Sequence, residues 1–343
     1  MLFRSNGMIG DRIKARNMIS FGLLFAGVSN LVFMFLAPVN ETLSLAAYAV
    51  TGFFLAMIYA PMTKVVSENT EPHHATRCSL GYTFSSLFGS PAAGIIAAVA
   101  FFWQVSFYVS SFAMIGMAVV CFFCFLRFEK KGYVKYGQYH PPKEKASGGT
   151  VGVLVRRGII RFTLIALLTG VVRTSVVFWL PTYFAAHLGY AEDSAAILFT
   201  VATLIISLSA FLSVFFYENL GRRMLFTTIL MFLVAAVCFF LTFLLPFRVT
   251  SGLFLTLGVL FSNAAANVLW SVYCPSLRDT GRVSSATGFL DFSSYMAAAL
   301  SSTLFASAAT TIGWNWLTLI WCGLMVCGVV VSMPFFSFGT KKN

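Results

Sequence analysis

Long apolar runs constrain this chain more than any other feature. Ten of them, each about 20 residues or longer, follow one another between charged residues, glycines and prolines. Backbone amides and carbonyls find no water in hydrocarbon, so runs of this length predict membrane-spanning helices. We therefore expect an all-α integral membrane protein. The expected spans are Met18–Ala37, Leu43–Val65, Arg77–Ala100, Trp103–Leu126, Gly158–Ala185, Ser194–Tyr217, Met224–Pro246, Gly252–Pro275, Val283–Thr310 and Trp314–Phe336.

The composition excludes an ordinary soluble domain. Of the 343 residues, 59% are apolar and 10% are charged, whereas soluble domains have about 25% charged residues. So few charged side chains cannot cover a water-exposed exterior of this size. Membrane lipid is therefore an expected partner.

The basic residues predict how the chain crosses the membrane. Loops on alternating sides, with the N-terminus in the cytoplasm, place every Lys and Arg on the cytoplasmic side except Arg248 and the intramembrane Arg173. This asymmetry is typical of membrane proteins and explains the net charge of +12 without a nucleic-acid partner. We predict a multi-pass protein of the plasma (inner) membrane with both termini in the cytoplasm.

The spans fall into two groups. Four precede a long polar stretch and six follow it. We expect a helix bundle over residues 1–126, a cytoplasmic central loop over 127–157 and a six-helix bundle over 158–343.

Two cytoplasmic segments carry related motifs. The run 7–16 contains Gly7, Asp11, Arg12 and Arg16, and it resembles the G-x-x-x-D-R-x-x-x-R signature loop of the major facilitator superfamily. In the second half, Glu218-Asn-Leu-Gly221-Arg222-Arg223 resembles the repeat of that signature. The resemblance implies a conformational latch, in which an acid pairs with bases or with a helix N-terminus. A basic loop that serves only topology is the alternative.

The stretch Arg173-x5-Trp179-Leu-Pro181-Thr182-Tyr183 resembles the seventh helix of the organophosphate:phosphate antiporter branch of that superfamily. The resemblance implies that Arg173 is a phosphate ligand. An intramembrane Arg costs at least about 2.5–3.5 kcal/mol, so it should contact a wet cavity or a partner. Its guanidinium matches phosphate or carboxylate. A buried structural ion pair is the alternative for Arg173, and packing alone is the alternative for Tyr183.

Four further residues are candidates for the site. Asp291, about 12 Å into its span, could take up a proton or bind a cationic group, or bond to neighbouring helices. Asn263 and Asn267 share one helix face and either line the cavity or form interhelical hydrogen bonds. Tyr59 is a weaker cavity candidate.

The resemblance covers the chain from about Gly7, with departures. Major facilitator proteins of this branch have twelve helices, so ten imply a fold that is N-terminally incomplete by two helices. The branch's fifth-helix His has no counterpart in Thr83-Phe-Ser85-Ser86. Membership of the superfamily is therefore a firmer expectation than specificity for phosphate esters.

These observations predict a secondary active transporter that moves a small organic anion, phosphorylated or carboxylated, by alternating access. Phosphate or a proton is the candidate coupling ion. A proton-coupled carrier of another solute and a truncated, non-transporting relic or sensor are the alternatives. The sequence has no Walker loop, G-x-S-x-G or H-E-x-x-H motif, so we expect no enzyme and no cofactor. We also expect no metal site and a monomer.

Overall fold

The computed structural model describes residues 2–83, 102–139, 149–245 and 247–333, together with residues 89 and 96. Every regular element in this part of the chain is a helix. Eight helices among the described residues are long and apolar enough to cross a membrane. The predicted all-α membrane fold is confirmed. The eight are Ala15–Leu36, Glu41–Asn69, Trp103–Lys130, Ile159–His187, Glu192–Asn219, Met224–Leu244, Arg248–Ser276 and Trp314–Ser332.

Two of the ten expected spans, the third and the ninth, have no counterpart among those eight helices. The ninth corresponds to α15 (Val283–Thr311), which has 29 residues but is not among those eight helices. The third begins in α5 (Pro72–Thr83), and most of the remainder lies outside the described residues.

The chain divides into two compact units, and the division does not follow the sequence continuously. Unit 1 comprises Met1–Ala75, Ala92–Lys145 and Cys274–Phe289. Unit 2 comprises Thr76–Pro91, Ala146–Tyr273 and Leu290–Asn343. The start of α15 thus belongs to unit 1 and the rest of this helix to unit 2.

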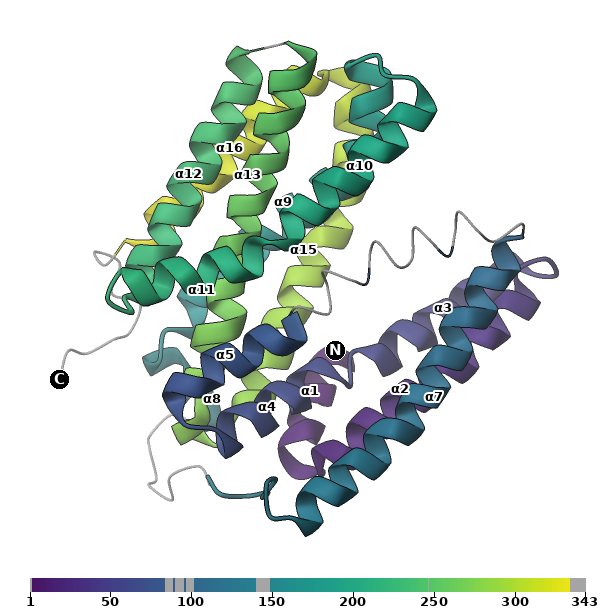
Figure 1. The fold of residues 1–343 in the computed structure, drawn as a ribbon, viewed down its shortest axis with the longest axis vertical. Helices are drawn as coiled ribbons and strands as arrows, with labels where there is room; N and C mark the ends of the chain where they lie inside the picture. Colours follow the sequence, from purple (N-terminus) through teal and green to yellow (C-terminus); the bar gives the residue numbers. More distant parts are fainter. Residues whose placement is uncertain are drawn as a thin grey trace. The chain divides into compact units, whose positions relative to one another are not determined.

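Unit 1 is built around α2 (Ala15–Leu36), which packs against α3 (Glu41–Leu55) and α7 (Trp103–Lys130) (Figure 1). Toward α7, the Asn30 amide donates hydrogen bonds to the hydroxyls of Ser110 at 3.2 Å and Ser111 at 2.9 Å. Toward α3, the hydroxyls of Ser29 and Thr51 lie 2.9 Å apart. Polar groups that pair between helices stabilise a bundle in lipid, where burial of apolar surface provides no driving force.

Two helices of unit 1 differ from the sequence expectation. The run 7–16, expected as a loop, is helical through Arg12 because α1 covers Leu2–Arg12. The second span is interrupted between α3 and α4 (Tyr59–Asn69). Pro61 accounts for the interruption because it has no amide hydrogen to donate to the carbonyl of Met57.

Unit 2 contains most of the C-terminal helices. Its first long helix, α9 (Ile159–Thr182), continues as the π-helix η1 (Tyr183–His187). A short break at Leu208 divides the next span into two helices. The other elements of the second half are α8 (Gly149–Arg156), α10 (Glu192–Ser207), α11 (Ser209–Asn219), α12 (Met224–Leu244), α13 (Arg248–Val268), η2 (Leu269–Tyr273), α14 (Cys274–Ser276), η3 (Arg278–Thr280) and α16 (Trp314–Ser332), of which α14 and η3 belong to unit 1.

The core of unit 2 lies where α12 packs against α13 and α16. Two phenylalanines of α12 lie against glycines of the neighbouring helices. A Cβ atom on Gly258 would approach the Phe239 ring to 2.8 Å, and one on Gly328 would approach the Phe232 ring to 2.9 Å. These glycines leave the space that the rings fill, and such close packing stabilises the bundle.

A third glycine contact joins α9 to α15. A Cβ atom on Gly170 would lie 2.5 Å from the backbone oxygen of Ser294, and both residues are buried. The two helix backbones therefore approach each other as closely as a glycine permits.

We predict that Gly170→Ala destabilises the chain by about 1–3 kcal/mol, because the added methyl group meets backbone that cannot move independently. Gly323→Ala in α16 is the matched control, since a Cβ there meets no atom within 4 Å. Thermal unfolding of both variants in one detergent tests this. Equal Tm values would contradict the close approach.

Candidate substrate site and signature segments

Arg173 is the candidate site residue with the most unusual environment. It occupies the midpoint of the span Ile159–His187, so about 21 Å of helix separates it from either end. Its side chain is half-buried, and no described residue accepts a hydrogen bond from it or forms an ion pair with it. The guanidinium carbon lies 6.0 Å from the centre of the Tyr295 ring, within the range of a cation–π interaction.

Asp291 lies on α15, on the face that packs against α9. It precedes Ser294 by three residues, and residues with this spacing share one helix face. The residue as a whole is half-buried, and its carboxylate accepts no hydrogen bond from the described part of the chain. Arg173 exerts an electrostatic attraction on Asp291 without forming an ion pair. Unit 2 therefore holds a separated cation and anion inside the membrane.

Tyr295 completes this group, and sequence reasoning did not assign it to the site. It follows Asp291 by four residues, so the two side chains project from the same face of α15. Its ring is 53% exposed, in contrast to the buried residues on either side of the contact between α9 and α15. The spacing of four residues from Asp291 could have indicated that Tyr295 belongs to this group.

The two candidate asparagines of α13 have different surroundings. The Asn267 amide donates a hydrogen bond of 3.1 Å to the Ser209 hydroxyl at the start of α11. An interhelical hydrogen bond is one of the two roles that the sequence allows for Asn267. The side-chain oxygen of Asn263 is buried, and it has no hydrogen-bond partner among the described residues. Asn263 therefore keeps a buried acceptor without a partner in the described structure, whereas Asn267 already has one.

Tyr183 is packed inside unit 2. It is 2% exposed, and its hydroxyl lies 2.6 Å from that of Ser251. Its ring contacts Trp314 at 5.4 Å between ring centres. These contacts are those of a packing residue, the alternative considered for Tyr183. Tyr59, the remaining candidate, is half-buried in unit 1, where its carbonyl accepts a hydrogen bond from Thr63.

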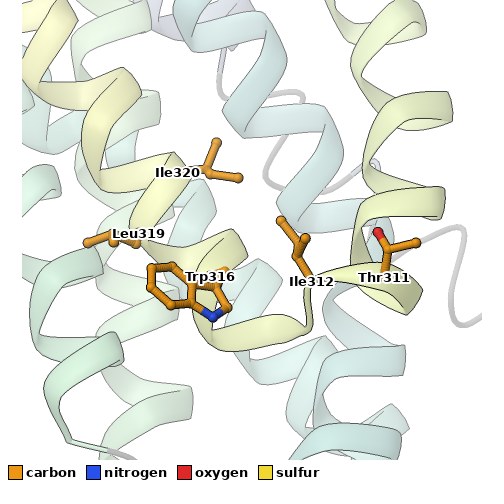
Figure 2. Close-up of a pocket in the computed structure, with 5 residues that line it drawn as sticks. All are labelled: Thr311, Ile312, Trp316, Leu319 and Ile320. Atoms are coloured by element: carbon orange, nitrogen blue, oxygen red, sulfur yellow. The ribbon is translucent and has the colours of Figure 1, made fainter.

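A separate pocket lies where α15 meets α16 (Figure 2). Its lining residues are Thr311, Ile312, Trp316, Leu319 and Ile320. None of these side chains is charged, so this pocket offers an anion no charged partner. The described residues also contain no group of three or more His, Cys, Asp or Glu arranged to hold a metal ion.

In unit 1, Asp11 holds the start of α15. Its carboxylate accepts hydrogen bonds from the backbone amides of Ser284 at 3.2 Å and Ser285 at 3.1 Å, and from the Ser285 hydroxyl. The Lys64 ammonium lies 3.8 Å from the same carboxylate. An acid at a helix N-terminus satisfies free amides and interacts favourably with the helix dipole.

The surroundings of Asp11 affect the pKa of its carboxyl in two opposite ways. Burial raises the pKa of this carboxyl, while the hydrogen bonds from Ser285 and the charges of Lys64 and Arg282 lower it. Two glycines allow α1 to reach this position. A Cβ on Gly7 would lie 2.7 Å from the carbonyl oxygen of Ser284, and one on Gly10 would clash with the hydroxyl of the same serine.

The two arginines of the first motif differ. Arg12 is exposed. Arg16 forms an ion pair of 2.7 Å with Glu129 near the end of α7 and lies over the Phe122 ring. The Tyr136 hydroxyl donates a hydrogen bond to the same carboxylate. Burial, together with the interaction with Glu129, raises the pKa of Tyr136 to about 12.

The second motif has its own partner in unit 2. Glu218 accepts two hydrogen bonds from Arg77 of α5, at 3.0 and 3.1 Å. This contact raises the pKa of Arg77. Gly221 and Arg222 both have positive φ angles, 68° and 59°, and form the exposed turn before α12. Arg223 is exposed at the start of that helix. In both motifs the acidic residue contacts an element distant in sequence, and in the first motif Arg16 does so as well.

We predict that Asp11→Ala destabilises the first turn of α15, because two amides lose their acceptor. The expected cost is about 1–2 kcal/mol, so the amides of Ser284 and Ser285 should exchange with deuterium about five- to thirtyfold faster. Arg12→Ala removes an exposed neighbouring charge and should leave both rates unchanged. Unaltered exchange in Asp11→Ala would rule out the capping role.

Solved structures share this fold at low sequence identity. The E. coli fucose:proton symporter FucP superposes with a TM-score of 0.75 at 14% identity, over 100% of this chain and 88% of the symporter. A bacterial homologue of the iron transporter ferroportin gives 0.74 at 12% identity, over 98% and 87%. The human organic anion transporter MFSD10 gives 0.63 at 14% identity, over 95% and 83%. At such identities the likeness shows the fold alone.

The sequence provides the family assignment. No curated protein matches the chain. Residues 5–302 of the sequence do match a known protein family. Its members are transporters and not enzymes, so the prediction of a multi-pass membrane transporter is confirmed at this level. The chain belongs to the Major Facilitator Superfamily.

Proposed function

We propose that this transporter carries a small organic anion, phosphorylated or carboxylated, by alternating access. The observation that carries the proposal is the guanidinium of Arg173, which is held at the midpoint of a membrane-length helix without an acidic partner in contact among the described residues. Such a charge is costly unless a ligand or water compensates it. A planar guanidinium binds phosphate or carboxylate through two parallel hydrogen bonds.

The motif around Arg173 supports the same substrate class. The spacing Arg173-x5-Trp179-Leu-Pro181-Thr182-Tyr183 resembles the organophosphate:phosphate antiporter branch, in which the arginine binds phosphate. The human neighbour MFSD10 is itself described as an organic anion transporter. We further propose that the protein resides in the plasma membrane with both termini in the cytoplasm, as the distribution of Lys and Arg favours.

The signature segments supply the conformational part of the proposal. The contact of Asp11 with the start of α15 and the contact of Glu218 with Arg77 each join elements distant in sequence. Hydrogen bonds of this kind stabilise one conformation and must break if the elements separate. We propose that both act as latches during the transport cycle.

We predict that Arg173→Ala lowers the uptake of radiolabelled organic phosphates and carboxylates by proteoliposomes at least tenfold. A hydrogen bond to a charged group contributes about 1.5–3 kcal/mol. Arg173→Lys keeps the charge but not the two-pronged geometry, so it should give intermediate uptake.

Arg248→Ala is the matched control, since this arginine is exposed at the start of α13. Uptake that is equal in Arg173→Ala and the wild type would refute the assignment of Arg173. Binding of the anion without any flux would favour the non-transporting alternative.

Asp291 supports a second candidate function, proton-coupled transport. An intramembrane carboxylate with no contacting partner among the described residues can take up a proton during the cycle. If Asp291 takes up the coupling proton, an inward proton gradient should accelerate uptake in the wild type and not in Asp291→Asn. Uptake driven equally by the gradient in both proteins would exclude Asp291 as the coupling residue.

A further inference from the structure

The arrangement of charges around Arg173 bears on the substrate in more detail, provided that the proposed anion transport is correct. Arg173 and Asp291 lie on neighbouring helices of unit 2 and contact each other through no ion pair. Both residues are half-buried. The close contact of Gly170 with Ser294 sets the distance between the two helices that carry these residues.

The direction of the helices determines how the charges are separated. Four membrane-length helices, beginning with α9 itself, precede α15 in this half of the chain, so α9 and α15 run in the same direction. Arg173 follows Gly170 by three residues, whereas Asp291 precedes Ser294 by three. The two residues thus lie on opposite sides of the helix contact, about 9 Å apart along the axes.

The position of Tyr295 agrees with parallel helices. In that arrangement Arg173 lies nearly level with Tyr295, and the guanidinium carbon is 6.0 Å from its ring centre. Asp291 lies one turn earlier on the same face of α15. The site therefore has a cationic end at Arg173 and Tyr295 and an anionic end at Asp291.

A simple anion fits this site poorly. Once bound to Arg173, its negative charge lies close enough to Asp291 to be repelled, because charges interact strongly in a site with little water. An ammonium group on the same ligand reverses the sign of this interaction. It can also donate hydrogen bonds to the carboxylate, which has no donor among the described residues.

We propose that the transported molecule is a small zwitterion, with its phosphate or carboxylate bound to Arg173 and its ammonium group bound to Asp291. The molecule bridges two charges that do not reach each other. It neutralises both, which lowers the cost of holding these charges inside the membrane. Asp291 then selects against anions that lack the amine.

Matched pairs of probes that differ only in the ammonium group test this. Phosphoethanolamine is compared with ethyl phosphate, β-alanine with propionate, and γ-aminobutyrate with butyrate. Binding to the purified full chain in nanodiscs is measured by isothermal titration calorimetry. We expect the amine-bearing member of at least one pair to bind the wild type at least tenfold more tightly, which corresponds to about 1.4 kcal/mol.

Variants assign the preference to Asp291. Asp291→Asn should abolish the preference for the amine and still bind the amine-free member, while Asp291→Glu should retain the preference and so exclude misfolding as the cause. Asp193→Asn, which removes an exposed carboxylate at the start of α10, should behave as the wild type.

Several results would overturn the zwitterion. One is equal or weaker binding of the amine-bearing member in every pair, and another is no binding of any pair. A preference that survives Asp291→Asn would do so as well. Amine-free anions that bind the wild type more tightly as the pH falls, with uptake of one proton, would instead support proton coupling. Failure of the proposed function gives a different result, namely unchanged binding of both members in Arg173→Ala.

Discussion

The cost of holding an unpaired charge in hydrocarbon is the constraint on which the account of this transporter rests. An arginine at the centre of a membrane span costs about 2.5–3.5 kcal/mol or more, so other interactions must offset this free energy. Arg173 has an aromatic ring beside it and a carboxylate within electrostatic range, yet it has no direct ion pair in the described structure. A ligand that neutralises the guanidinium removes much of that cost.

The same physical reasoning explains the packing around the site. Lipid provides no hydrophobic driving force between helices, so close contact and polar pairing must hold them together. Gly170 permits α9 to contact α15, and Gly258 and Gly328 permit the rings of α12 to contact α13 and α16. In unit 1, Asn30 and Ser29 pair with hydroxyls of the neighbouring helices. These small residues set the spacing of the helices that carry the charged residues.

Much of the fold could be predicted from the sequence, because long apolar runs leave a chain few choices in a membrane. The helical start of the chain was missed, since the run 7–16, which contains Gly7 and Gly10, resembles a signature loop. Their role depends on Ser284 and Ser285, which are distant in sequence and which no local pattern connects to Asp11. The candidate site shows the same limit. Helical spacing predicts that Asn263 and Asn267 share a face, but not that Asn267 bonds to Ser209.

The central claim is that Arg173 lines a water-filled site that opens to either side of the membrane. Cysteine accessibility tests it most directly, in a chain whose seven native cysteines have been replaced. A charged, membrane-impermeant thiol reagent should label Arg173→Cys from both faces of sealed vesicles. It should not label Phe178→Cys, because Phe178 is 68% exposed on the apolar surface of α9 and should face lipid. If Arg173→Cys were labelled from neither face, residue 173 would be closed to water and the account would be wrong.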